Sequence, residues 1–112
     1  MPDTAACLAN ARDYARRGAA HVQDVDAAAF ASDQMRKDAV CFCLVIVGEA
    51  CNEAAKHLKK LPPEIPWGEI KGMRNILVHQ YWQIDEAVIY NAARREADRL
   101  ADLLDQLIMR YS

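Results

Sequence analysis

The sequence predicts an all-α protein, an antiparallel four-helix-type bundle with a short extra helix or turn. Twenty of the 112 residues are alanine, the residue with the highest helix propensity. The chain holds only four glycines and four prolines, too few for a many-turned β-sandwich. Apolar residues recur at intervals of three and four in four separate segments, which is the period of an amphipathic helix.

Two of these segments lie in the first half of the chain. The first predicted helix runs from about residue 4 to residue 22, with Thr4 as its cap. A short acidic stretch follows at 23–26, and Ser32 or Asp33 then caps a long second helix. The apolar stripe of the first helix comprises Leu8, Ala11, Ala15, Ala19 and Val22. The predicted inner face of the long helix comprises Met35, Ala39, Phe42, Cys43, Ile46, Ala50, Ala54 and Leu58.

Three prolines separate the long helix from the second half of the chain. Proline has no amide donor and restricts the residue before it, so Pro62, Pro63 and Pro66 end the helix. A third helix begins near Trp67, and Asp85 is expected to cap a fourth. The third helix carries Ile70, Met73, Leu77 and Tyr81, and the fourth encloses Val88, Ala92, Leu100, Leu103 and Leu107.

Composition excludes several classes of protein. The net charge of −2 and the pI near 5.9 argue against a protein that holds nucleic acid by bulk charge. No apolar run reaches 18 residues, and no basic-then-apolar signal sequence is present, so we expect a cytosolic protein without a membrane segment. Four residues, Cys7, Cys41, Cys43 and Cys51, are expected to be reduced, buried thiols.

Polar residues interrupt the third helix between Arg74 and Tyr81. Asn75 and His79 are four residues apart and therefore neighbours on a helix, whereas Arg74 and Tyr81 share a face two turns apart. Arg74 and His79 lie about 140° apart around the axis. They meet only if the arginine reaches round, the helix loosens, or a second copy approaches. A histidine suits acid–base catalysis and an arginine can clamp phosphate, but on these residues alone a simple polar cluster at a helix end is the favoured explanation.

The spacing Arg-x4-His-x-Tyr, here Arg74, His79 and Tyr81, resembles the signature of HEPN-domain ribonucleases, and specifically their HepT-like toxin branch. The likeness spans roughly residues 4 to 108. Further segments similar to that branch are Val47-Gly48-Glu49-Ala50, Pro66-Trp67, the lead-in Ile70-x-Gly72-Met73-Arg74-Asn75, and Ile84-Asp85.

The resemblance implies a fold, an activity and two partners. Residues 1–112 would form a single HEPN domain that dimerises and brings two motifs to one cleft. It would be an endoribonuclease that needs no metal or other cofactor, the toxin of a type VII-like toxin–antitoxin pair. In that scheme His79 is the general acid or base, Arg74 holds the phosphate, and Asn75 orients His79 or binds phosphate. An MntA-type minimal nucleotidyltransferase would silence it by transferring AMP to Tyr81.

Charge is unevenly distributed along the chain. Residues 56 to 74 hold five basic and two acidic side chains, so Lys56, Lys59, Lys60 and Lys71 are candidates for RNA approach. Solvation of a helix end explains the lysines equally well. A second strip, Arg94, Arg95 and Arg99, is expected to pair with Glu96, Asp98 and Asp102. His21 and His57 are predicted to be solvated side chains.

Two other functions remain open on the sequence alone. One is a non-catalytic HEPN module that binds a nucleotide or docks a nucleotidyltransferase. The other is a metalloprotein that uses Cys43, Cys51 and His57 as ligands.

Overall fold

The computed structural model describes residues 3–111, and every regular element in that range is helical. The elements are α1 (Thr4–Val22), α2 (Ala27–Ala31), α3 (Gln34–Ala55), α4 (Trp67–His79), the 3-10 turn η1 (Tyr81–Gln83), α5 (Glu86–Asn91), the π-helical turn η2 (Ala92–Glu96) and α6 (Ala97–Met109). The predicted all-α fold is confirmed, and α2 is a short extra helix. No helix within residues 3–111 is long and apolar enough to cross a bilayer.

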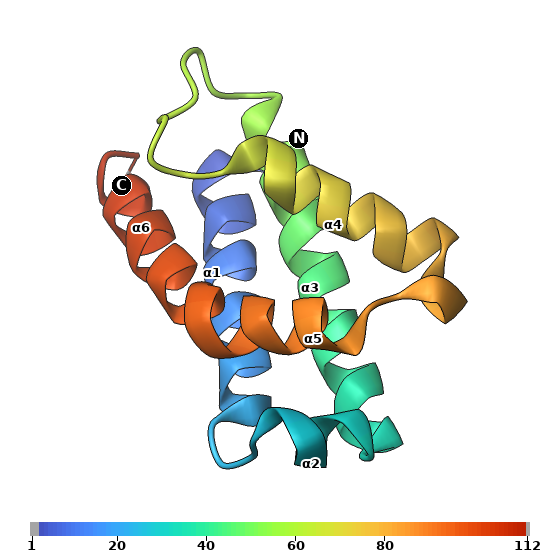
Figure 1. Cartoon of the computed structure of the whole chain (residues 1–112). Coiled ribbons are helices and arrows are strands. Elements are labelled where there is room, and N and C mark those ends of the chain that lie inside the picture. The colour runs from blue at the N-terminus through green and yellow to red at the C-terminus, as the bar shows by residue number, and fades with distance from the viewer. Residues whose placement is uncertain (1–2, 112) are drawn as a thin grey trace.

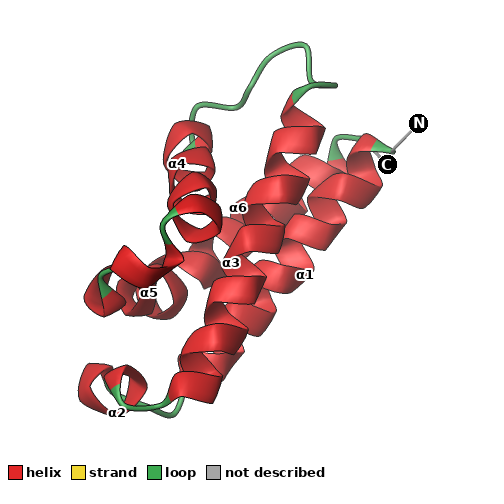
Figure 2. Cartoon of the chain, turned by 90° about the vertical axis from the view of Figure 1, so that its right-hand side faces the viewer, coloured by secondary structure: helices red, strands yellow, loops and turns green. Residues whose placement is uncertain are grey.

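The central element is α3, which lies between α1 on one side and α4 and α5 on the other (Figure 2) and contributes to two hydrophobic clusters. On one side it packs with α1 and α6 around a cluster that includes Leu8, Cys51 and Leu104. On the other side it packs with α2, α4 and α5 around Phe30, Leu77 and Ile89. No polar or charged residue is buried in the described part of the chain, so both clusters are held by apolar packing.

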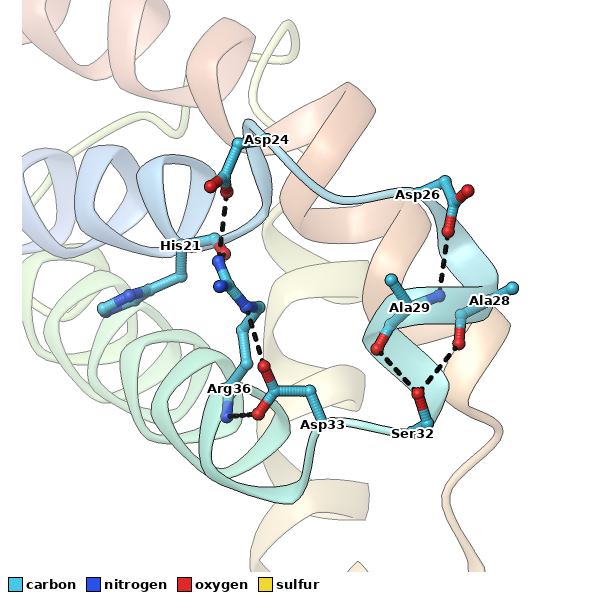
Figure 3. Close-up of polar contacts among 8 residues, drawn as sticks. All are labelled: His21, Asp24, Asp26, Ala28, Ala29, Ser32, Asp33 and Arg36. Carbon is cyan, nitrogen blue, oxygen red and sulfur yellow. Dashed lines mark hydrogen bonds and ion pairs between the residues drawn. The ribbon is translucent and has the colours of Figure 1, made fainter.

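Arg36, near the start of α3, fixes the junction between α1 and α3 (Figure 3). Its Nη1 donates to the backbone oxygen of His21 at 2.5 Å and to Asp24 at 3.1 Å. Its Nε donates to Asp33 at 3.1 Å. Because bonds of a guanidinium to carboxylates are charge-assisted, one side chain ties together the end of α1, the turn after it and the first residue before α3.

Aspartates cap the N-termini of four helices. Asp33 accepts from the amide of Arg36 and is the cap of α3, and Asp85 accepts from the amide of Ala87 and caps α5, as predicted. The prediction that Thr4 caps α1 is wrong. Thr4 is the first helical residue, and Asp3 accepts from the amide of Ala5. An Asp accepts this bond as readily as a Thr, so the sequence allowed either position.

The inner face predicted for the long helix is partly wrong. Met35 is 86% exposed and Phe42 is also exposed, although Phe42 meets the ring of Tyr14 edge-on. Leu58 is buried, but it lies beyond the end of α3 at Ala55. The helix is covered on two sides, so a single stripe does not describe its burial. Its buried residues are Val40, Cys41, Cys43, Leu44, Val47, Gly48, Cys51 and Ala54.

The fourth predicted helix is divided by η2. In Figure 1, α5 crosses the bundle, whereas α6 runs along α1 after the π turn. A π turn inserts one residue into the helical repeat, so the inner face is not one continuous stripe. Val88 is therefore exposed instead of buried, and Ile89 and Ala93 point into the core in its place. Leu107 is buried as predicted.

Gly48 allows α3 and α4 to approach closely. A Cβ atom built on Gly48 would lie 2.8 Å from Cγ of Arg74 and closer still to its Cβ. Any larger residue at this position would therefore collide with the stem of Arg74. The contact between Gly48 and Arg74 sets the spacing of the two helices at the position of the predicted motif.

We predict that Gly48→Ala lowers the free energy of unfolding by about 1–3 kcal/mol, the usual cost of overpacking. Gly72→Ala on α4 is the matched control, because a Cβ there meets nothing within 4 Å. That change is expected to stabilise the fold by up to about 1 kcal/mol through helix propensity. Urea denaturation of both variants measures the difference. Equal stability of the two variants would contradict the close approach.

Candidate functional site

The helix α4 carries most of the predicted motif and is anchored at both ends. At its start, Trp67 Nε1 donates to the backbone oxygen of Pro62 at 3.0 Å, which folds the connecting loop back onto the helix. Ile70 and Met73 pack against the two clusters, and Leu77 is buried between α3 and α5. The apolar face of α4 thus fixes the rotation of the helix and decides where Arg74, one residue after Met73, projects.

Arg74 is oriented by two neighbours. Its Nε donates to Glu49 Oε1 on α3 at 2.6 Å, and its Nη2 also contacts that oxygen. Its Nη1 donates to Oδ1 of Asn75 at 2.9 Å. The arginine side chain stays 25% exposed, so part of the guanidinium faces solvent. An ordered, partly exposed guanidinium of this kind can bind a phosphate oxygen.

Glu49 is a site residue to which sequence reasoning gave no role. It was noted only as part of a segment similar to the family. A signal was present, because Glu49 is the only charged residue between positions 39 and 52, within an otherwise apolar part of α3. The carboxylate of Glu49 is exposed on α3, and it pairs with Arg74.

His79 is the last residue of α4 and is exposed. Its side chain makes no hydrogen bond or ion pair with the residues that the structure describes, and the side chain of Asn75 is bonded to Arg74 instead. The helix stays α-helical from Arg74 to His79, and Arg74 is held against α3. One chain therefore does not bring Arg74 and His79 together.

Tyr81 does not lie on α4, contrary to the prediction. Gln80 leaves the helical conformation with φ −136° and ψ 35°, and Tyr81 begins the turn η1. Its hydroxyl donates to Oδ1 of Asp38 on α3, which also accepts from Nε2 of Gln34 at 2.7 Å. The bond to the carboxylate raises the pKa of Tyr81 to about 12. The same bond lowers the pKa of Asp38.

The basic residues proposed for RNA approach lie in three places. Lys56 follows α3 and pairs with Glu53 at 3.2 Å. Lys59 and Lys60 lie in the loop before α4, and Lys71 lies on α4 one turn before Arg74. All four lysines are exposed.

The expected pairing of the second basic strip is wrong. Within residues 3–111, no carboxylate forms an ion pair with any of the three arginines, Arg94, Arg95 and Arg99. Asp102 instead lies 3.7 Å from Arg16 on α1. Two of the arginines, Arg94 and Arg95, lie within the π turn η2, which shifts their direction relative to a regular helix.

The cysteines are buried and free. Burial raises the pKa of Cys51 to about 12 and also raises that of Cys43, which disfavours the thiolate needed for a metal bond. Nowhere in the described range do three His, Cys, Asp or Glu side chains group closely enough to hold a metal ion. Cys43, Cys51 and His57 therefore do not form a metal site within the described residues. Nε2 of His57 instead lies 3.7 Å from Glu53.

Residues 8–107 match the model of a known family, described as Ribonuclease HepT-like. The chain belongs to the HepT-like ribonuclease family. It is 31% identical over 86 residues to a protein of Methanocaldococcus jannaschii named as a candidate RNase, a match that covers 77% of this chain and 74% of the relative. It is 33% identical over 78 residues to a Thermococcus cleftensis protein named "Probable ribonuclease HepT", covering 70% and 71% of the two chains. No solved structure gives a significant match.

Membership agrees with the resemblance that the sequence suggested, and the matched range includes Arg74, Asn75, His79 and Tyr81. In this HepT-like chain the four residues fall on one helix and the turn that follows it. Side chains of α3 hold two of them, since Glu49 binds Arg74 and Asp38 binds Tyr81.

We predict that Tyr81 ionises at a higher pH than an ordinary tyrosine. Its folded pKa of about 12 lies above the ordinary value of 10.0, so it stabilises the fold below pH 10 and loses that contribution as the pH rises toward 12. In a spectrophotometric titration, Tyr81→Phe is expected to remove a component that ionises near pH 12, and Asp38→Asn to shift that component toward 10. Loss of a component near pH 10 in Tyr81→Phe would contradict the bond to Asp38.

Proposed function

We propose that this chain is a metal-independent endoribonuclease toxin that works as a homodimer, with Arg74 and His79 of two copies at one cleft. The observation that carries the proposal is the state of the two side chains. Arg74 is oriented by Glu49 and Asn75, whereas His79 is exposed and has no partner within the described residues. An ordered cation and a free imidazole at the end of the same helix are what cleavage of a phosphodiester requires.

The chemistry assigns one task to each side chain. His79 acts as general base or acid while a ribose 2′-oxygen attacks the adjacent phosphorus and the bond to the 5′-oxygen breaks. Arg74 binds the phosphate and offsets the negative charge that develops on it. Glu49 and Asn75 keep the guanidinium in place during this step. Proton transfer and charge stabilisation by side chains suffice for this reaction, so no cofactor is part of the proposal.

Exposed apolar side chains around the motif support the proposal that a second copy binds here. Trp82, next to Tyr81, is 77% exposed. Ile76 and Val78, on α4 between Arg74 and His79, are also exposed, and so is Phe42 on α3. Large apolar side chains gathered near a polar site are typical of a protein interface. An interface here would cover these side chains and bring the partner's motif toward His79.

Two further parts of the proposal concern the approach of RNA to the site and the silencing of the ribonuclease. Lys56, Lys59, Lys60 and Lys71 attract RNA toward α4 by a local positive field inside an acidic protein. The regulatory partner is an MntA-type nucleotidyltransferase that attaches AMP to Tyr81. Tyr81 is 42% exposed and lies two residues after His79, so an added nucleotide would bring bulk and negative charge to the RNA site.

A second candidate is a non-catalytic HEPN module that only docks a nucleotidyltransferase or binds a nucleotide. The ion pair between Arg74 and Glu49 favours it, because the charge of the arginine is already met by a carboxylate. Cleavage assays with motif variants distinguish the two candidates.

We predict that Arg74→Ala and His79→Ala each lower RNA cleavage in the presence of EDTA by about 10²–10⁴-fold, the usual contribution of a general acid or base. The control variants are His57→Ala and Arg95→Ala, which replace the same residue types away from α4. They are expected to cleave tRNA and mRNA as the wild type does. Cleavage that survives both motif variants, or that stops when EDTA is added, would contradict the proposal.

We predict that mixing Arg74→Ala chains with His79→Ala chains restores activity. In a symmetric dimer the shared cleft holds two composite pairs of Arg74 and His79, and a mixed dimer keeps one of them intact, so random exchange gives about a quarter of wild-type activity. Scattering at micromolar concentration measures the dimer, whose mass is twice the chain mass of 12.6 kDa. A monomer in solution, or mixtures as inactive as each variant alone, would contradict the shared cleft.

A further inference from the structure

Asp38 is the only acidic side chain hydrogen-bonded to a tyrosine within residues 3–111. Its Oδ1 accepts from the Tyr81 hydroxyl and from Nε2 of Gln34, so the carboxylate is held from two sides. Asp38 and Gln34 lie one turn apart on α3, and Tyr81 comes from the turn after α4. Two elements far apart in the sequence thus bring the carboxylate of Asp38 within hydrogen-bonding distance of the Tyr81 hydroxyl.

Tyr81 needs such a partner if it is to react as a nucleophile. A phenol attacks phosphorus effectively only as its proton leaves, and Tyr81 retains that proton throughout the neutral range. The carboxylate of Asp38 is ionised in that range, because its hydrogen bonds lower its pKa. The pair is therefore a neutral phenol that donates to an ionised acceptor, which is the arrangement that general-base catalysis requires.

The surroundings leave room for a nucleotide beside this pair. Asp38 and Tyr81 line a hollow of about 420 Å³ whose other walls are Cys41, Phe42, Val45 and Leu77. This hollow is shallow and open to solvent, and its walls are mostly apolar. A nucleoside triphosphate carried by a transferase can therefore approach the hydroxyl from the side where the hollow opens.

We propose that Asp38 is the proton acceptor when a nucleotidyl group is transferred to Tyr81, an inference that rests on the silencing step proposed above. The phenolic oxygen forms a bond to the α-phosphorus of a nucleoside triphosphate supplied by the transferase. The bond from that phosphorus to the bridging oxygen breaks, and pyrophosphate leaves with its electron pair. The phenolic proton passes to Oδ1 of Asp38 and then to solvent. The toxin thus supplies the base for its own modification.

Other titratable groups near the pair set its pH range. Lys37 lies beside Asp38 on α3 and lowers its pKa further, while Nζ of Lys37 is bound to Glu86 on α5 at 2.9 Å. Cys41 lies near Tyr81 and is itself a neutral thiol, since burial raises its pKa to about 11. With its pKa lowered, Asp38 does not change charge between about pH 6 and pH 9, and neither does Cys41 with its pKa raised to about 11. Asp38 is therefore ionised across the whole range.

The first test needs only the chain and an electrophilic phosphorus reagent. Diisopropyl fluorophosphate is the probe, with fluoride as the leaving group, and mass spectrometry measures labelling of Tyr81. We expect a nearly constant rate from about pH 6 to 9 in the wild type, and in Asp38→Asn at least a tenfold lower rate at pH 7 that rises with pH. Tyr111 is an internal control, because it is exposed and its hydroxyl makes no bond within the described residues.

Two further variants complete this test. Tyr81→Phe assigns the label, and Asp98→Asn, on the exposed face of α6, is the matched carboxylate control and is expected to react as the wild type does. Circular dichroism shows that each variant is folded. If Asp38→Asn reacts with Tyr81 as fast as the wild type, or faster, Asp38 only shields the hydroxyl and the proposal is overturned.

The second test uses an MntA-type nucleotidyltransferase with radiolabelled ATP. We expect Asp38→Asn to lower kcat for labelling by at least tenfold while KM for the chain stays the same, because the variant keeps the surface that the transferase contacts. Equal labelling of the wild type and Asp38→Asn would overturn the role of Asp38 alone. A wild-type chain that takes no label would overturn the silencing step and with it the role of Asp38. RNA cleavage that depends on Arg74 and His79 would stand in either case.

Discussion

The close approach of α3 and α4 is the constraint on which the site depends. Gly48 has no side chain, so the stem of Arg74 can rest on the backbone of α3 and reach Glu49. The apolar contacts of α4, above all the buried Leu77, hold the helix in the rotation that this approach requires. A neutral contact between two helices therefore positions a charged group, which is the usual way in which a rigid scaffold supports a functional side chain.

A single helix supports both ends of the motif. Glu49, which binds Arg74, and Asp38, which binds Tyr81, are eleven residues apart on α3, or about three turns of helix. They therefore lie on the same face of α3, the face that α4 and η1 cover. His79 lies between these two supports and has none of its own in the described structure. The polar groups on α3 thus orient the cation and the tyrosine, while no described side chain orients the imidazole.

The sequence predicted the helices better than their faces. Apolar spacing, capping residues and prolines together located both ends of α1 and the starts of α3, α4 and α5. They could do so because all three signals lie in the local sequence. It misplaced Phe42 and Val88, because burial depends on how many neighbours a helix has and on the π turn, neither of which spacing records. For the site, the motif was visible as a pattern, but the partners Glu49 and Asp38 were not. Both come from a helix that is distant in sequence, and only the tertiary packing brings them to Arg74 and Tyr81.

The ion pair between Arg74 and Glu49 also has a consequence for which anions could bind at Arg74. Glu49 is tethered to the same fold, so it competes for the guanidinium at a high effective concentration that does not change with the solution. A single free phosphate gains one contact and must displace this carboxylate, which leaves little net affinity. A polyanion that makes several contacts at once can offset that displacement. If Arg74 binds RNA phosphate as we propose, the internal carboxylate would favour polyanions over small anions before any base is recognised.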